Sequence, residues 1–455
     1  MDMAKAVRID IITKQTIRPS SPTPQHLRYI KLSLLDQLNF AMSTPILLFY
    51  PSKGDTSNIH DHIKEQSQRL KSSLSKALTL FYPLAGKITD NSFVECTDCG
   101  IQYTEAQVNC AISDVFERPD NDFLEKLMPI DLSSTLTGAI VQCNFFACGG
   151  LVIGVSLSHK ITDAASLGTF LGAWATMSLG SPPPHVVLPH FVSDTIIPSM
   201  KEPSLLPPPP PLILELTKCK TRRYVLDASK VSILKAKAAS KCVQQPTRVE
   251  AVTAFFWKCL MTISRSKQSG CAKSSVLTQA LNFRRRLVPP LPQNYIGNLS
   301  GKFIVETKVT TSNLELADLV SLLREGLERM SNDVAKGGQT IDMAGLLEFA
   351  KEFGELHNRD DTDLYSFTSL CGFPLYEIDF GWGKPTWAIV TNLVLKNYVL
   401  MIDATDGKGV EVWMSLSEED ATLFDRNQEL LAFASINPSV KCGDGKGDPA
   451  LTSCL

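Results

Sequence analysis

The sequence lacks an excess of charge of either sign, since 45 Lys and Arg residues oppose 47 Asp and Glu residues in 455 positions. A net charge of −2 argues against a nucleic-acid binder, which needs a basic face, and against docking to anionic membranes. Apolar residues make up 44% of the chain, which is enough for a large core. The length alone predicts two to four domains of ordinary size.

Long hydrophobic runs are also missing. The N-terminal twenty residues contain no uninterrupted apolar segment, so no secretory signal is predicted. The longest nearly uncharged stretch, Ala139 to Ser158, is interrupted by Gln142, Asn144 and the turn Cys148-Gly149-Gly150. This pattern predicts a hairpin rather than a membrane span.

The twelve cysteines have no regular spacing, and Cys96-x-x-Cys99 has no matching pair to complete a site of about four zinc ligands. We therefore expect no metal site, and reduced thiols that are mostly buried, in a cytoplasmic protein. The chain also lacks G-x-G-x-x-G after a strand and a Walker A motif. A glycine loop that holds nucleotide phosphates is not indicated.

What the sequence does contain is a change of period around His159. Residues Leu151 to Ser158 form an apolar run typical of a buried strand, and the helical spacing of apolar residues from Ala164 to Leu179 follows. His159 is thus predicted at the end of a strand and Asp163 at the start of a helix. A rigid element would hold the imidazole without covering its tip.

The His159-x-x-x-Asp163 spacing by itself is a weak motif, because a core histidine and a helix-capping aspartate give the same pattern. The functional interpretation is a general base, since the ordinary pKa of histidine, about 6.5, provides neutral imidazole at physiological pH. Such a base contributes roughly 10²- to 10⁴-fold to a rate. Asp163 either accepts a hydrogen bond from the imidazole or points away and braces the loop, and the spacing leaves both open.

Nucleophilic alternatives are weaker. Ser158 and His159 are neighbours on a strand and point to opposite faces, and Cys143 and Cys148 lie in no nucleophile motif. A second unusual string, Asp379 to Pro385, places Trp382 between two glycines. Trp382 is either a core side chain or one whose N–H lines a site, and Asp379, between apolar neighbours, is expected to need an arginine or backbone amides as partners.

Strand-like and helix-like segments alternate in both halves of the chain, which predicts an α/β protein of two lobes. Residues 1–180 form the expected first lobe, 181–221 a proline-rich crossover, and 222–455 the second lobe. The run Ala388 to Asp403 is expected to be one long apolar strand or hairpin. Thr247 and Glu250 have the spacing of a capping box.

The combination of His159-x-x-x-Asp163 with Asp379-Phe-Gly-Trp-Gly383 resembles the plant BAHD acyltransferase family. Further similar segments extend over nearly the whole chain: Ser21-Pro-Thr-Pro24, Leu35-Asp36-Gln37, Phe81 to Lys87, Asn282-Phe283-Arg284 and Gly297-Asn298. The resemblance implies two chloramphenicol-acetyltransferase-like domains with a solvent channel between them. It also implies transfer of an acyl group from an acyl-CoA co-substrate through a ternary complex, with no permanently bound cofactor.

Carried onto this sequence, the resemblance implies His159 as general base and Asp379 as an acid essential to activity. It implies that Asp163 turns away from the imidazole and pairs with Arg284 to hold the loop. Residues implied to border the coenzyme are Trp382, Thr253, Gly297 and Asn298.

The string Tyr295-Ile-Gly-Asn-Leu299 departs from the Tyr-Phe-Gly-Asn-Cys typical of members that modify anthocyanins. Three segments are more similar to members that acetylate alkaloids: Pro19 to Pro24, Leu35-Asp36-Gln37 and Gly381-Trp-Gly-Lys-Pro385. We therefore expect acetyl transfer from acetyl-CoA to a hydroxyl of a plant alkaloid, by a monomer with no nucleic-acid or membrane partner. The alternatives are a sugar ester, terpenoid or phenolic acceptor with another acyl-CoA, and a catalytically silent metabolite-binding relative.

Overall fold

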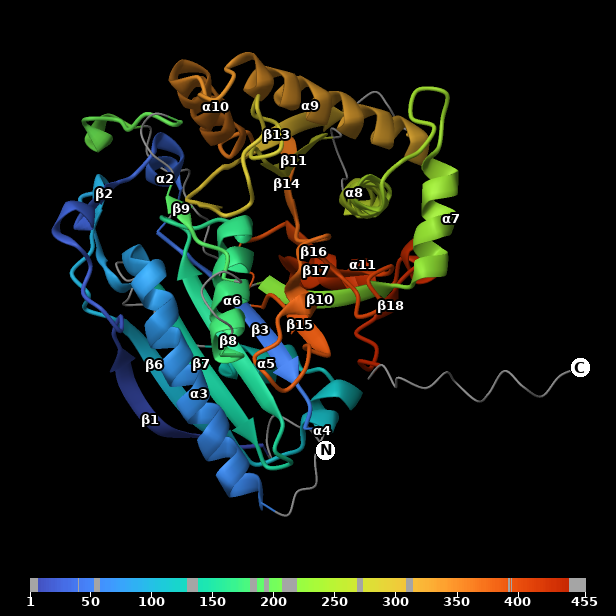
Figure 1. Cartoon of the computed structure of the whole chain (residues 1–455). Coiled ribbons are helices and arrows are strands. Elements are labelled where there is room, and N and C mark those ends of the chain that lie inside the picture. Colours follow the sequence, from blue (N-terminus) through green and yellow to red (C-terminus); the bar gives the residue numbers. More distant parts are fainter. Residues whose placement is uncertain are drawn as a thin grey trace, which may run out of the picture.

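The computed structural model describes residues 7–39, 41–52, 58–128, 138–180, 186–191, 196–206, 219–267, 273–307, 314–391, 393 and 395–441. The runs Pro182 to Pro184 and Pro207 to Pro211, on which the crossover prediction rests, lie outside these residues. Within the described part, the chain forms an α/β structure with two large sheets and two small ones (Figure 1).

The first half of the chain contains these helices and strands: β1 (Ile9–Ile17), β2 (Tyr29–Lys31), α2 (Leu34–Leu38), β3 (Ser43–Tyr50), α3 (Ile59–Leu80), β4 (Lys87–Thr89), β5 (Phe93–Glu95), β6 (Ile101–Val108), α4 (Ile112–Glu117), α5 (Asn121–Lys126), β7 (Ala139–Phe146), β8 (Leu151–Ser158), α6 (Ala164–Ser178) and β9 (His190–Phe191). The second half contains the following: β10 (Cys219–Leu226), α7 (Ala228–Ala238), α8 (Arg248–Lys267), β11 (Ser274–Asn282), β12 (Tyr295–Ile296), β13 (Ser300–Thr307), α9 (Leu316–Lys336), α10 (Met343–Leu356), β14 (Thr362–Ser369), β15 (Trp387–Ile389), β16 (Tyr398–Asp403), β17 (Val410–Ser417), α11 (Glu418–Asp425), α12 (Gln428–Leu431) and β18 (Ser435–Ile436).

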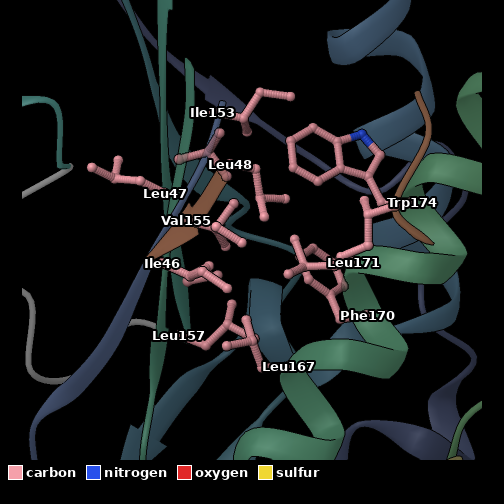
Figure 2. Close-up of a cluster of buried hydrophobic side chains, with 14 of the residues drawn as sticks. Ile46, Leu47, Leu48, Ile153, Val155, Leu157, Leu167, Phe170, Leu171 and Trp174 are labelled. Atoms are coloured by element: carbon pink, nitrogen blue, oxygen red, sulfur yellow. The ribbon is translucent and has the colours of Figure 1, made fainter. Parts of the chain in front are cut away.

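The first large sheet has the strand order β1-β6-β7-β8-β3-β15, and helices α3 and α6 cover one of its faces (Figure 1). The predicted hairpin is confirmed, since β7 and β8 pair antiparallel. Apolar residues at i, i+3, i+4 and i+7 of α6 pack on β3 and β8, as Figure 2 shows for Leu167, Phe170, Leu171 and Trp174. This core holds β8 rigidly, and His159 is the residue that follows it.

The second large sheet has the order β13-β11-β14-β16-β17-β10-β18. One of its faces packs with α7, α8 and α9 in a separate core. The predicted capping box at the start of α8 is confirmed, because the Glu250 carboxylate accepts from the Thr247 amide and the Thr247 hydroxyl accepts from the Glu250 amide. Two short strands, β9 from the crossover and β12, pair parallel.

The predicted single strand or hairpin over Ala388 to Asp403 is wrong. The structure divides this run between sheets: β15 pairs with β3 of the first sheet, whereas β16 pairs with β14 and β17 of the second. Both strands are largely buried, so an apolar run has the same appearance in either sheet. Residues from the expected second lobe therefore complete the sheet that carries His159.

The cysteine prediction is only partly right. All nine cysteines in the described residues are free, but only three of them, Cys96, Cys143 and Cys259, are buried. In the described ranges, no set of three His, Cys, Asp or Glu side chains is placed to hold a metal ion. None of the described helices combines the length and apolar character that crossing a membrane requires.

Candidate active site

His159 follows β8 at a tight turn. The Ser158 carbonyl accepts hydrogen bonds from the backbone amides of Ile161 and Thr162 and from the Thr162 hydroxyl, the last at 2.8 Å. The His159 amide donates to the carbonyl of Met42 at 2.8 Å. The turn is thus fixed by its own backbone bonds and by the segment before β3, and His159 itself is only partly buried.

Asp163 caps α6, as predicted, by accepting from the Ser166 amide at 2.9 Å. Its carboxylate also receives Arg284 Nη1 at 2.6 Å and Nη2 at 3.1 Å, and the Leu299 amide at 3.1 Å. Although burial opposes ionisation, Arg284 and the Ser166 hydrogen bonds hold the pKa of Asp163 below its ordinary value. No hydrogen bond joins it to the imidazole, so the bracing alternative and the predicted Arg284 partner are both confirmed.

Arg284 is fully buried and connects the two halves of the chain at this point. Besides Asp163, its guanidinium donates to the carbonyl oxygens of Tyr295 and Gly297, at 2.6 Å and 3.1 Å from Nη2. The Ser166 hydroxyl also donates to the Gly297 carbonyl, at 3.2 Å. The turn that contains Gly297 is therefore fastened to the start of α6.

Asn298, the next residue, is fully buried and holds the imidazole. Its Nδ2 donates to the Asp36 carboxylate and to the His159 carbonyl, both at 2.8 Å. Because both partners accept, the other amide atom facing His159 Nδ1 at 3.1 Å is the oxygen Oδ1. An amide oxygen only accepts, so Nδ1 carries the hydrogen and Nε2 of the neutral ring keeps its lone pair.

Asp36 fixes Asn298 in turn. Its Oδ1 accepts from the Asn298 backbone and side-chain amides, and its Oδ2 accepts from the Ser33 amide and hydroxyl at the start of α2. Burial raises the pKa of Asp36 and these hydrogen bonds oppose the rise. Lys160, beside His159, donates to the carbonyls of Gln37 and Asn39 just past Asp36, and burial lowers the pKa of Lys160 to about 8.

The pKa of His159 is lowered from its ordinary value, chiefly by burial. The Lys302 ammonium acts in the same direction, whereas the His159 backbone, Asp163 and the Asn298 side chain oppose the shift. The imidazole is therefore neutral at physiological pH. The geometry provides a basic nitrogen, Nε2, on a ring whose other nitrogen is already engaged.

The structure does not bring Asp379 to His159. The Asp379 carboxylate accepts from the backbone amides of Gly381 and Gly383 at 2.7 Å and 2.9 Å, and these glycines have φ angles of 113° and 108°. Ser178, at the end of α6, donates to the Phe380 carbonyl. At about 1.5 Å per residue, α6 separates this loop from Asp163 by roughly 20 Å. The expected amide partners are confirmed, but they make Asp379 a residue that shapes its own loop.

Trp382 and Thr253, the other residues expected to border the coenzyme, make their contacts away from His159. Trp382 packs against Tyr50 and Phe380 in the first core, with ring centroids 6.2 Å and 5.9 Å away. Thr253, on α8, is fully buried and its hydroxyl meets the sulfur of Met401 at 3.6 Å. Gly297 and Asn298 are in the site, but in the network that orients His159.

Sequence reasoning missed Asp36 and Ser166, and it placed Asn298 without its contact to the imidazole. Asp36 stands in the segment Leu35-Asp36-Gln37, which contributed to the family resemblance without an assigned role. Asp36 and Asn298 are 262 positions apart in the sequence, so no local spacing reveals this bond. The Ser166 contact with Gly297 spans 131 residues in the same way.

Comparison with known proteins places the chain among acyltransferases. The family model described as Transferase family matches residues 7–431. Vinorine synthase from Rauvolfia serpentina is 35% identical over 429 residues, covering 92% of this chain and 96% of that one. A crystal structure of vinorine synthase matches with a TM-score of 0.80 at 32% identity, covering 95% of this chain and 100% of that chain.

Two further relatives differ in the acyl group that their names give. Epi-neemfruitin B 7-O-acetyltransferase from Melia azedarach is 35% identical over 460 residues, covering 94% of this chain and 99% of its own. The 17,18-epoxy-17-hydroxycur-19-ene N-malonyltransferase from Strychnos nux-vomica is 34% identical over 434 residues, covering 94% and 91%.

Proposed function

The chain belongs to the BAHD acyltransferase family, and from that membership we propose that it transfers an acetyl group from acetyl-CoA to a hydroxyl of a plant specialised metabolite, with an alkaloid as the first candidate acceptor. It is an acyltransferase whose co-substrate is an acyl-CoA. The similarity to an O-acetyltransferase supports acetyl-CoA as the donor. The similarity to vinorine synthase supports an alkaloid as the first candidate acceptor.

The observation that carries the mechanism is the orientation of His159. Its Nδ1 hydrogen is committed to Asn298 Oδ1, and Nε2 therefore has a free lone pair. In the proposed reaction, Nε2 removes the proton of the acceptor hydroxyl while its oxygen attacks the thioester carbonyl. A tetrahedral intermediate forms, its C–S bond breaks, and the coenzyme A thiolate takes the proton back from the imidazolium.

The remaining parts of the site have supporting roles in this proposal. Asp163 and Arg284 hold the loop and the Gly297 turn, and Asn298 keeps the imidazole in one tautomer, so these are positioning residues. We place both substrates in a passage between the lobes, because His159 comes from the first half of the chain and its partner Asn298 from the second. Asp379 and Trp382 act at a distance, by shaping the loop that follows β14.

The test is His159→Ala, with His62→Ala on the exposed start of α3 as the matched control. We expect His159→Ala to lower turnover by about 10²- to 10⁴-fold while the protein still binds coenzyme A, as measured by free-thiol release and by calorimetry. His62→Ala should behave as wild type. Near wild-type turnover by His159→Ala would refute the base assignment.

A donor and acceptor screen decides between the alternatives. Wild-type protein is incubated with acetyl-CoA, malonyl-CoA and longer acyl-CoAs and with alkaloid, terpenoid, sugar-ester and phenolic alcohols, and products are identified by their mass gain. Acetylation of an alkaloid supports the main proposal, and transfer to another class replaces it. Coenzyme A binding without transfer to any acceptor would identify a silent relative.

A further inference from the structure

Lys302 is a charged group whose field reaches His159, and the mechanism above leaves it unused. It lies on β13 directly before Phe303. Phe303 and Val305, which alternate along the strand, are buried against Gly326 of α9. Because side chains alternate along a strand, Lys302 projects from the other face of the second sheet. Its strand begins two residues after Asn298, the partner of the imidazole.

The sheet face that carries Lys302 is not part of the second core. On β11, Lys302 pairs with Ala280. On β14, Ser366 and Thr368 belong to the same face as Lys302 and are only partly buried. Tyr365 and Phe367, which point to the opposite face, are buried. Close to the lysine this face thus carries small, partly buried side chains, whereas Val276 and Thr278 farther along β11 are buried. Such a surface leaves room for a substrate.

Lys302 also has no acidic partner. Its Nζ lies 4.4 Å from the centroid of the Phe353 ring on α10, and among the described residues no Asp or Glu forms an ion pair with it. The titratable groups around it are His159 and His357, and its charge lowers the pKa of both. Asp163, four residues after His159, is committed to Arg284.

Lys302 is partly buried, and burial lowers its pKa to about 8. Desolvation of a cation is costly, and an anion placed beside it recovers that cost. The phosphates of coenzyme A cannot supply this anion, because the pantetheine arm separates them from the thioester that reacts at His159. The charge must therefore come from the acyl group or from the acceptor.

We propose that Lys302 determines specificity by binding a substrate carboxylate close to the reacting carbon, either on the acyl group of the donor, as in malonyl-CoA, or on the acceptor. The inference rests on the proposed acyl transfer and sharpens its substrate class. It makes Lys302 a binding residue, and the small residues on its sheet face provide space for the carboxylate.

The experiment has two arms. The first compares malonyl-CoA with acetyl-CoA, and the second compares hydroxylated terpenoid and alkaloid acids with their methyl esters, with kcat/KM measured from free-thiol release and product mass. Lys302→Met removes the charge at similar length, and Lys302→Arg keeps it. Lys237→Met is the matched control, since the Lys237 Nζ also lies over a phenylalanine ring, Phe433 at 5.1 Å, but on the exposed face of α7.

Wild type and Lys237→Met are expected to prefer the charged substrate by about tenfold or more in one arm, as for a charge-assisted hydrogen bond. Lys302→Met should lose that preference and Lys302→Arg should keep part of it. Transfer by wild type with no preference in either arm would overturn the inference while leaving the acyltransferase proposal intact. A preference that survives in Lys302→Met would also overturn it. Absence of transfer with every donor and acceptor would overturn both.

Discussion

Two buried arginine–carboxylate pairs, similar in chemistry, occupy different regions of the molecule. Arg284 and Asp163 join through two hydrogen bonds at 2.6 Å and 3.1 Å, and Arg223 and Glu411 join at 2.7 Å and 2.9 Å. All four side chains are at most 5% exposed. What differs is the set of groups around each pair.

The Arg223 pair fastens the two large sheets together. Arg223 and Glu411 lie on neighbouring strands β10 and β17 of the second sheet, and Trp387 comes from β15 of the first. The Trp387 Nε1 donates to both Glu411 oxygens at 3.2 Å, and the Arg223 guanidinium lies 4.9 Å from the Trp387 ring centroid. None of these contacts reaches His159.

The Arg284 pair, in contrast, is connected to the imidazole. Arg284 binds the Gly297 carbonyl, and the next residue, Asn298, contacts both His159 Nδ1 and its carbonyl. The comparison teaches that burial and geometry do not separate a structural ion pair from a positioning one. The two kinds of ion pair are distinguished by the residues that each pair contacts.

Replacing the carboxylate of each pair with an amide should have the largest effect on stability. Asp163→Asn and Glu411→Gln each leave a buried guanidinium without its counter-charge, so each should lose about 3–5 kcal/mol of stability. At a temperature where both remain folded, only Asp163→Asn should also lower kcat, because only its loop carries His159. Chemical denaturation and steady-state kinetics on the same samples measure both quantities. Equal kcat per folded molecule for the two variants would contradict a positioning role that belongs to the Arg284 pair alone.

A smaller effect is expected one step closer to the imidazole. Asn298→Ala removes the group that accepts from Nδ1. It should lower kcat by roughly 10- to 100-fold, with little change in KM, by analogy with the groups that orient metal-binding imidazoles. Asn144→Ala is the control, because Asn144 is also fully buried but donates to the carbonyls of Leu127 and Val152. Melting temperatures should fall in both variants, and a similar kcat loss in both would argue against a positioning role.

The smallest effect concerns pH. Since burial lowers the pKa of His159, the neutral base predominates above that pKa, and kcat/KM should fall only as the pH drops through a value below 6.5. Lys302→Met removes a cation that helps to lower this pKa, so it should move the acid limb to higher pH. The pKa of Lys302, lowered by burial to about 8, leaves it charged where His159 titrates. An unshifted limb in a variant that remains folded would show that Lys302 does not act on the imidazole.

The local part of the site was predictable from the sequence. A strand period of two that changes to a helical period places His159 at the turn and Asp163 at the helix start, because both periods depend on neighbours in sequence. Family resemblance added Arg284 as the partner of Asp163, and the hydrogen bonds confirm it.

The long-range part was not predictable in this way. The run Ala388 to Asp403 is apolar throughout, and an apolar run does not reveal which sheet each of its parts joins. The partnership of Asp36, Asn298 and His159 depends on three segments that meet only in the folded chain. The family resemblance implies that Thr253 borders the coenzyme, and α8 places its hydroxyl in the core beside Met401.

The central claim is that His159 is held as the Nδ1–H tautomer with Nε2 free to act as base. Heteronuclear NMR of ¹⁵N-labelled histidine measures this directly, with the His159 signals assigned by their loss in His159→Gln. We expect, at neutral pH, a protonated Nδ1 and an unprotonated Nε2 for this residue. A ring found instead with its proton on Nε2, or with both nitrogens protonated at that pH, would contradict the account.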